Sequence, residues 1–488
     1  MTRFTIRWLV YSTLLMGGLS LIGCGEHLES DLPPTMPDNP TIADKENSDP
    51  NGTPVDRITD NLNVAVDEHR KGVDAWINVT RIDRSDGETR VEHFEYGDTA
   101  NRKDFWPAST IKMFTATAGL ELLTEWGFTI DAVATFYYQD QDGEWIEDTS
   151  MSFRELVRRT FDCSSNITYT LLLRLAGVDW LNQTFFPKYG MTNTALMRGY
   201  MRSTDRPYGY QIWVPQRIVI TDAGRTVERI HTYSGISHAE NAGCTVWNGS
   251  GMGNCSSPRD MSEHLRRLIM HNELPVNERF DIRNDLMDWY RGDGSDLVLN
   301  NIAGDDCGGP VLDGVRQVFD SPQLYHKEGL VSEYRGSIHY VKDEPTQTEY
   351  VAAIMLKSPS AQLLAKITEE VARVMRDDGN YVHLGSLRDY VNPVQANLVI
   401  QSKEPGTLKV RLKPYHLDPY APEGWFTPSG FDVSIVPGLN AYALESGCQD
   451  VEGTYHVQAT LEDSTGAPTA QSDLHYVIIE NDGRCSQY

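Results

Sequence analysis

Two residues at the start of an apolar segment could carry out acyl transfer. Ser109 and Lys112 follow Pro107 and stand three positions apart, which places both side chains on one face of a helix. Burial and a second nearby cation would both disfavour the charged form of Lys112. The neutral amine could then accept the proton of the Ser109 hydroxyl, at a helix end whose dipole favours negative charge. These residues predict a nucleophilic serine with a lysine base.

Two later segments support this pair, which alone is expected on the order of once by chance in a chain of this length. Ser164-Ser165-Asn166 precedes an apolar helical run, and Lys327-Glu328-Gly329 lies in a predicted strand. With 107–112 they resemble, in order, the three motifs of serine β-lactamases and penicillin-binding proteins. The resemblance covers residues 57–378. Three further segments in this range are similar to class A β-lactamases, namely Phe153-Arg154-Glu155-Leu156, Gly190-Met191-Thr192-Asn193-Thr194 and Ser257-Pro258-Arg259-Asp260-Met261.

The resemblance implies a role for each motif residue. Ser109 would be the acylated nucleophile, Lys112 its proton partner, and Ser164 the relay to the leaving nitrogen. The backbone N–H groups of Ser109 and Leu330 would form the oxyanion hole. The substrate would be bound by an amide, a positive charge and the strand that carries it, namely by Asn166, Lys327, Gly329, Leu330 and Arg335.

The sequence departs from the family pattern at three places. Ser165 replaces an Asp that is mainly structural. Glu328 replaces a hydroxyl residue that normally contacts the substrate carboxylate, so it would repel that group unless protonated or compensated, for instance by Arg335. The stretch 194–202 contains no acid, and Tyr200 falls about where class A enzymes carry their deacylating Glu. Without a base to activate water, an acyl-enzyme should persist.

Three functions follow. The class A-like segments favour a β-lactam hydrolase. The missing Glu favours a D,D-peptidase-like enzyme acting on peptidoglycan stem peptides, or a degenerate, non-catalytic binding protein of the cell envelope. Ser109 and Lys112 could also be an ordinary helix start. No metal or organic cofactor is implied, since no Cys/His group has zinc spacing; His264 and His271 are interpreted as solvated, and Asp140–Gly143 as a hairpin turn.

The helices and strands expected along the chain predict an α/β fold that positions these residues. Helices are expected at 56–70, 107–123, 152–176, 257–270 and 361–375, and strands at 75–82, 91–96, 324–331, 335–342 and 349–357. This order predicts a β-lactamase/transpeptidase-like two-lobed domain over 57–378. An antiparallel sheet built from both ends of the segment would be flanked by helices and joined to an all-α lobe. Alternating runs after Val391 predict a small all-β sandwich over 391–488.

The N-terminus reads as a targeting segment. A basic start and an apolar run end in Leu21-Ile22-Gly23-Cys24, which resembles the lipobox of bacterial lipoproteins, so 1–24 is predicted to be a signal peptide with Cys24 lipidated. Residues 25–56 are rich in proline and acids and predict a disordered tether. The expected location is the cell envelope, anchored to a membrane by lipid, at the outer-membrane or periplasmic face.

The net charge and the number of cysteines indicate which binding partners and which cross-links to expect. The net charge of −26 argues against nucleic-acid binding. Six cysteines remain beyond Cys24, an even number that suits disulfides in an exported chain. Cys244–Cys255 and Cys448–Cys485 are the expected pairs among 15 possible pairings, with Cys163 and Cys307 paired or free.

Overall fold

The computed structural model describes most of the chain after the predicted tether. It covers residues 54–84, 89–140, 142–161, 164–201, 212, 214–246, 253–292, 309–387, 393–446 and 452–480. Cys24 and the predicted signal and tether up to residue 53 lie outside these residues. So do four cysteines (163, 307, 448 and 485) and Asp86-Gly87, whose residue types predict a hairpin turn between the strands at 75–82 and 91–96. Across the described ranges, no helix is both long and apolar enough to cross a membrane.

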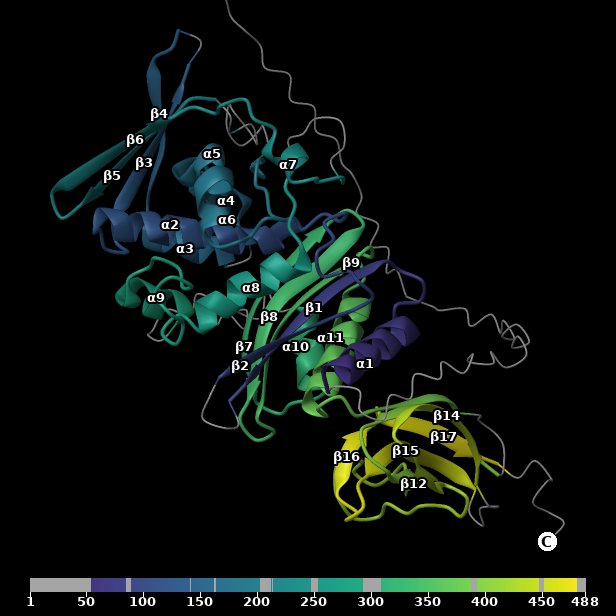
Figure 1. The fold of residues 1–488 in the computed structure, drawn as a ribbon. Helices are drawn as coiled ribbons and strands as arrows, with labels where there is room; N and C mark the ends of the chain where they lie inside the picture. The colour runs from purple at the N-terminus through teal and green to yellow at the C-terminus, as the bar shows by residue number, and fades with distance from the viewer. Residues whose placement is uncertain are drawn as a thin grey trace, which may run out of the picture. The chain divides into compact units, whose positions relative to one another are not determined.

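An antiparallel five-stranded sheet forms the centre of the first part of the chain (Figure 1). Its order is β2-β1-β9-β8-β7, so strands from both ends of the segment meet in it, as the sequence predicts. β7 and β2 are the two edge strands. Their bounds are β1 (Ala75–Asp83), β2 (Arg90–Glu95), β7 (Gln323–Val331), β8 (Tyr334–Asp343) and β9 (Thr348–Leu356).

Helices cover both faces of this sheet. Every residue of β9 is buried, because side chains on each of its faces meet a hydrophobic cluster. One face packs against α1 (Pro54–His69), α10 (Pro310–Arg316) and α11 (Ala361–Arg376). The other packs against α8 (Pro258–Ile269), whose N-cap Ser257 accepts a hydrogen bond from Asp260 N.

The helical lobe holds the predicted nucleophile and differs from the prediction in two helices. The expected helix at 107–123 begins as a 3-10 turn, η1 (Ala108–Ile111), and continues as α2 (Lys112–Trp126). The expected helix at 152–176 is two helices, α3 (Phe153–Phe161) and α4 (Asn166–Ala176), because Ser164 and Ser165 interrupt it. The remaining helices are α5 (Val178–Trp180), η3 (Leu181–Phe185), α6 (Phe186–Lys188), α7 (His238–Asn241) and α9 (Asn284–Arg291).

A second, four-stranded sheet adds to this lobe and was not predicted. Its order is β4-β3-β5-β6. The turn after Asp140 joins β3 to β4, as predicted for Asp140–Gly143, with Asp140 N donating to Glu144 O at 3.0 Å. The bounds are β3 (Val133–Gln139), β4 (Trp145–Ser152), β5 (Gln216–Asp222) and β6 (Arg225–His231).

The C-terminal part is all β, which confirms the predicted fold class of an α/β domain followed by a β sandwich. One sheet has the order β10-β11-β14, and the other β13-β12-β15-β16, with β17 paired to β15. A separate hydrophobic cluster lies between them. The strands are β10 (Tyr381–Leu387), β11 (Gln395–Ser402), β12 (Gly406–Pro414), β13 (Asp432–Ile435), β14 (Gly438–Glu445), β15 (Gly453–Glu462), β16 (Pro468–Gln471) and β17 (His475–Ile479).

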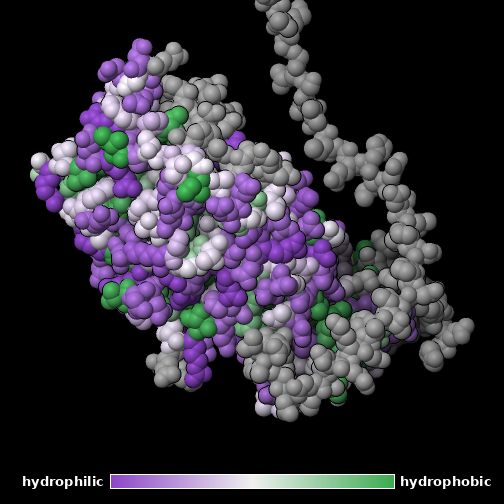
Figure 2. Space-filling view, turned by 45° about the horizontal axis from the view of Figure 1, so that its top comes forward, coloured by the Kyte–Doolittle hydropathy of each residue, from purple (hydrophilic) through white to green (hydrophobic). Residues whose placement is uncertain are grey.

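Two further sequence predictions meet the structure here. Cys244 and Cys255 form the expected disulfide. The interpretation of His264 and His271 as solvated was wrong, since both are fully buried. The His264 ring lies 4.4 Å from the Phe114 ring centroid, and its Nε2 is 2.8 Å from Thr117 Oγ1. On the face seen in Figure 2 the surface is largely hydrophilic, with scattered hydrophobic residues.

Candidate active site

The turn that carries Ser109 is held in an unusual backbone conformation. Ala108 has φ +51°, a region that residues with a Cβ rarely adopt. Its carbonyl accepts a hydrogen bond of 3.0 Å from the Tyr200 hydroxyl. Lys112 N donates to Ser109 O, which links the 3-10 turn to α2. Backbone strain that the surroundings maintain is characteristic of functional sites.

Lys112 is fully buried and surrounded by oxygen acceptors. Its Nζ lies 3.0 Å from Ser164 Oγ and 2.7 Å from Asn166 Oδ1, and it also donates to Ser164 O. Burial, and then repulsion from Lys327, lower the pKa of Lys112 to about 6. The amine is therefore largely neutral at pH 7. Within the described part of the chain its hydrogen bonds go to Ser164 and Asn166, and none goes to Ser109.

Ser164 lies between two lysines. Its backbone has φ +57°, and its Oγ lies 3.0 Å from Lys112 Nζ and 2.8 Å from Lys327 Nζ. The next residue, Ser165, caps α4 by accepting a hydrogen bond from Thr168 N at 3.3 Å. Because Ser165 is the N-cap, α4 begins at Asn166. The side chains on either side of the cap, Ser164 and Asn166, both contact Lys112 Nζ.

Lys327 and Gly329 bring the edge strand β7 against the nucleophile turn. Lys327 is buried, and burial lowers its pKa to about 8. Gly329 packs so closely that a Cβ there would lie 2.8 Å from Ser109 N and 3.0 Å from Thr110 N. No larger residue fits without displacing β7 from η1. The resemblance implies a substrate-binding role for Gly329, and the close approach explains why this position is a glycine.

Glu328 and Arg335 lie on the other face of the same sheet edge. Glu328 Oε1 packs directly against Gly309, where a Cβ would collide with it, and Val311 N donates to the same oxygen at 3.1 Å. Burial raises the pKa of Glu328, although attraction from Arg335 opposes the shift. The Arg335 guanidinium donates to Pro359 O at 3.1 Å. Leu330, which pairs with Arg335 across the two strands, has a side chain that is 54% exposed.

Two tyrosines that the motifs do not contain complete the surroundings of Lys112. The rings of Tyr169 and Tyr200 lie 6.0 and 5.9 Å from Lys112 Nζ and 4.8 Å from each other. Sequence reasoning noted Tyr200 but missed Tyr169. The missed signal was helical spacing, since Tyr169 stands three residues after Asn166 on α4.

Acidic side chains close enough to share a metal ion occur once among the described residues. They are Glu369, Glu370 and Asp473. Lys366 lies 2.8 Å from Glu370, and Arg373 lies 2.7 Å from Glu369 and 2.5 Å from Asp473. Ion pairs therefore already compensate these carboxylates, and they stand apart from the residues around Ser109.

Comparison with known proteins identifies the family. The sequence model of the β-lactamase enzyme family matches residues 79–377, more than half of the chain. Similar solved structures include a class A β-lactamase from Bacteroides cellulosilyticus DSM 14838, at 15% identity and TM-score 0.40, covering 65% of this chain and 98% of that one. A β-lactamase from Sphaerobacter thermophilus DSM 20745 has 14% identity and a TM-score of 0.42, and the match covers 66% of this chain and 96% of that one. A β-lactamase from Chitinophaga pinensis DSM 2588 has 14% identity and a TM-score of 0.40, and the match covers 65% of this chain and 97% of that one. No curated protein matches. On the strength of the sequence-model match, this chain belongs to the β-lactamase enzyme family.

Proposed function

We propose that the protein is an exported serine hydrolase that forms an acyl-enzyme at Ser109, with a β-lactam as its substrate. The observation that carries the proposal is the buried Lys112 amine. It shares Ser164 Oγ with the ammonium of Lys327, and its pKa is lowered to about 6. A neutral amine one helical turn from a serine hydroxyl is what nucleophile activation by a lysine requires.

The reaction follows from these positions. Lys112 Nζ accepts the Ser109 proton as Ser109 Oγ bonds to the lactam carbonyl carbon, and the carbonyl oxygen becomes an oxyanion. The N–H groups of Ser109 and Leu330 stabilise that charge, which the close approach of β7 at Gly329 supports. The C–N bond then breaks, and its nitrogen takes the proton of Ser164 Oγ. Lys112 returns a proton to Ser164 Oγ, so the site regains its starting protonation with Ser109 acylated.

Lys327 and Asn166 bind and orient the substrate in this proposal. The Lys327 ammonium lies 2.8 Å from Ser164 Oγ. It stabilises the negative charge that this oxygen carries when it gives its proton to the leaving nitrogen. Asn166 Oδ1 already accepts from Lys112, which leaves its NH₂ group to donate to a substrate amide oxygen.

A second candidate is a D,D-peptidase-like enzyme acting on stem peptides, and Tyr200 favours it. Burial raises the pKa of Tyr200, and its hydroxyl donates to Ala108 O. The phenol therefore stays protonated at neutral pH and is no base for a hydrolytic water. The described residues 194–201 contain no carboxylate. Slow hydrolysis of the acyl-enzyme would make the protein a penicillin-binding enzyme more than a β-lactamase.

Two reagents separate these functions. The purified protein is mixed with a chromogenic cephalosporin and, separately, with a labelled penicillin, with Ser109→Ala as the control. Continuous turnover that Ser109→Ala abolishes supports β-lactam hydrolysis. A stable one-to-one adduct on Ser109 without turnover supports the peptidase. No adduct with either reagent supports the non-catalytic binding protein and ends the proposal.

We also propose that Cys24 is lipidated and anchors the protein at the cell envelope. The motif Leu21-Ile22-Gly23-Cys24 carries this proposal. Cells that express the chain are given labelled palmitate, with Cys24→Ser as the control. Label and membrane retention that both depend on Cys24 are expected. An unlabelled wild-type protein released as a soluble form would contradict the anchor.

A further inference from the structure

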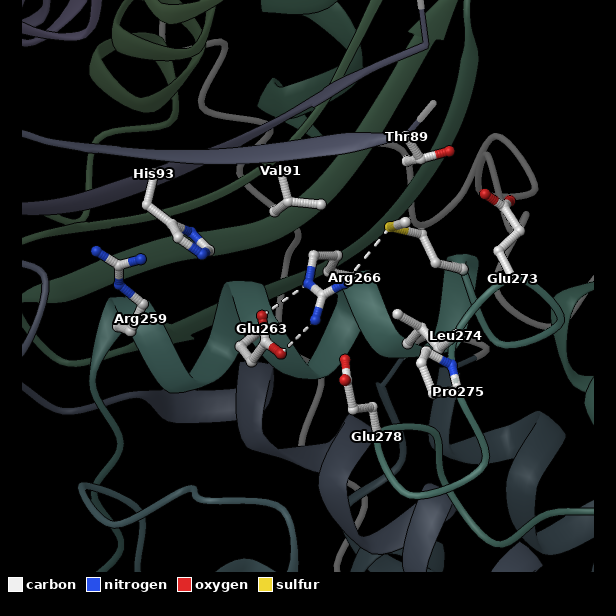
Figure 3. Close-up of a pocket in the computed structure, with 11 residues that line it drawn as sticks. Thr89, Val91, His93, Arg259, Glu263, Arg266, Glu273, Leu274, Pro275 and Glu278 are labelled. Atoms are coloured by element: carbon white, nitrogen blue, oxygen red, sulfur yellow. Dashed lines mark hydrogen bonds and ion pairs between the residues drawn. The ribbon is translucent and has the colours of Figure 1, made fainter. Parts of the chain in front are cut away.

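A groove lies between the edge strand β2 and helix α8, away from the candidate active site (Figure 3). Its volume is about 550 Å³, within the range of about 300–1,000 Å³ typical of small-molecule sites. One face of β2 and one face of α8 form its walls. The lining residues of β2 are two positions apart and those of α8 are three or four positions apart, so each set lies on a single face of its element. β2 is the sheet edge opposite β7, so the groove is separated from Ser109 by the width of the sheet. The lining residues include Val91, His93, Arg259, Met270, Leu274 and Pro275, together with the charged side chains Glu263, Arg266, Glu273 and Glu278.

One end of the groove holds a cation without a partner. Among the residues that the structure describes, the half-buried Arg259 guanidinium makes no hydrogen bond or ion pair, and burial lowers its pKa. Two nearby carboxylates are bound elsewhere: Glu95 accepts from Ala100 N at 2.8 Å, and Asp260 accepts from Asn193 N at 2.9 Å. The donors of Arg259 are therefore left for a ligand.

His93 adds a neutral donor beside this cation. Asn78 Nδ2 donates to Thr80 Oγ1 at 3.3 Å, so the Thr80 hydroxyl is free to give its proton to His93 Nδ1, 3.0 Å away. The His93 proton then resides on Nε2. Burial, and then Arg259, lower the pKa of His93 to about 4, so the ring is neutral at pH 7. In Figure 3 the ring extends from β2 towards α8, next to Arg259.

In the middle of the groove the charges of Glu263 and Arg266 compensate each other, whereas the exposed Glu278 carboxylate, which also lines the groove, has no hydrogen bond or ion pair among the described residues. Glu263 accepts from Arg266 Nε at 2.8 Å and Arg266 Nη2 at 2.6 Å, and these two side chains are only 19% and 9% exposed. The pair is thus satisfied and already largely removed from water. Val91, Met270, Leu274 and Pro275 supply apolar wall next to two carboxylates, Glu278 and Glu273, of which Glu273 is ion-paired with Arg84. A peptide backbone would need partners for each N–H and C=O in this part, whereas a hydrocarbon body needs none.

We propose that this groove binds an organic carboxylate with an apolar body. The carboxylate accepts hydrogen bonds from the Arg259 guanidinium and from His93 Nε2, and the body lies along α8 towards Met270 and Leu274. From Arg259 to Met270 the helix rises roughly 16 Å, enough for a medium-length alkyl chain. The proposal uses no residue assigned to acyl transfer and stands or falls independently of the proposed function.

Calorimetric titration with decanoate tests the site, with decanol and a decyltrimethylammonium salt as head-group controls. Decanoate should bind at one site per chain, and Arg259→Gln should weaken it about tenfold or more, since a charged hydrogen-bond partner is lost. Arg90→Gln is the matched control, because Arg90 precedes Val91 on β2 and belongs to the opposite face; it should bind as the wild type does. Leu274→Glu should also weaken binding, by placing a carboxylate beside the chain, with the fold of each variant checked by circular dichroism.

Three outcomes would overturn the proposal. They are the absence of saturable decanoate binding, equal binding by Arg259→Gln, and equal binding of decanol and decanoate to the wild type. The last would leave an apolar groove without an anion site. Labelled-penicillin acylation of Ser109 is measured in parallel on Arg259→Gln. Unchanged acylation shows that the effect on decanoate is local and separate from the nucleophile.

Discussion

At the scale of single residues, the two buried lysines predict how the reaction depends on pH. Acylation needs neutral Lys112, whose pKa is about 6, and charged Lys327, whose pKa is about 8. The rate should therefore rise as pH increases through about 6, because Lys112 loses its proton, and fall above about 8, because Lys327 loses its own. Stopped-flow acylation by a labelled penicillin measures this profile. A rate that stays constant from pH 5 to 9 would contradict both roles.

Lys112→Ala isolates the base. The variant should lose roughly 10²–10⁴ in acylation rate, the usual contribution of general acid–base catalysis. Lys188→Ala is a control at a lysine that pairs with Glu121 and Asp281 and has no part in the candidate site. Acylation by Lys112→Ala at the wild-type rate, in a protein with native circular dichroism, would exclude Lys112 as the base.

Glu328 sets a prediction about substrate charge. Its carboxylate is held at Gly309 and Val311, one residue from Lys327, where the family has a hydroxyl. If Glu328 faces the substrate carboxylate as an anion, Glu328→Thr should raise the acylation rate by penicillin, because the like charge is removed. Glu333→Thr removes an exposed carboxylate from the β7–β8 turn and should change little. An unchanged rate in Glu328→Thr would mean that Glu328 does not face the substrate carboxylate.

At the scale of elements, the approach of β7 to η1 is the contact on which the oxyanion hole depends. Gly329→Ala would place a Cβ 2.8 Å from Ser109 N, so the strand or the turn must shift. Acylation should fall about tenfold or more, since losing an oxyanion donor outright costs roughly 10²–10³ in rate and a misplaced donor loses part of that. Gln323→Ala is the matched control, because Gln323 is an exposed residue at the other end of β7 and has no part in the candidate site. Full activity in Gly329→Ala would show that the two elements can separate without cost.

The same elements show what the sequence could predict. Long periodic segments such as α8 and β7–β9 were predicted within a few residues, because one buried face dictates their pattern. The break at Ser164 was missed, since its positive φ depends on contacts with Lys112 and Lys327, far away in sequence. His264 was misjudged for the same reason: Phe114 and Phe280 bury it, and no local pattern reveals them.

At the scale of the whole molecule, the described residues form three hydrophobic clusters, and one of them lies entirely in the C-terminal sheets. None of the residues assigned to acylation comes from that part. Folding these strands nevertheless costs conformational entropy. The predicted boundaries, 57–378 and 391–488, therefore imply that the two parts have separable stabilities. This implication is testable on the intact chain before any truncation.

Differential scanning calorimetry of the full chain should resolve two transitions, because the C-terminal sheets have a hydrophobic cluster of their own and are joined to α11 mainly by ion pairs such as Arg373–Asp473. A stoichiometric penicillin adduct on Ser109 should raise the transition of the α/β part and leave the other unchanged, since a ligand stabilises only the unit that binds it. A chain that ends after residue 379, before β10, should then acylate at the full-length rate. A single transition that shifts as a whole with the adduct would mean that the sandwich is part of one cooperative unit with the site. In that case the 391 boundary would mark only a change of architecture.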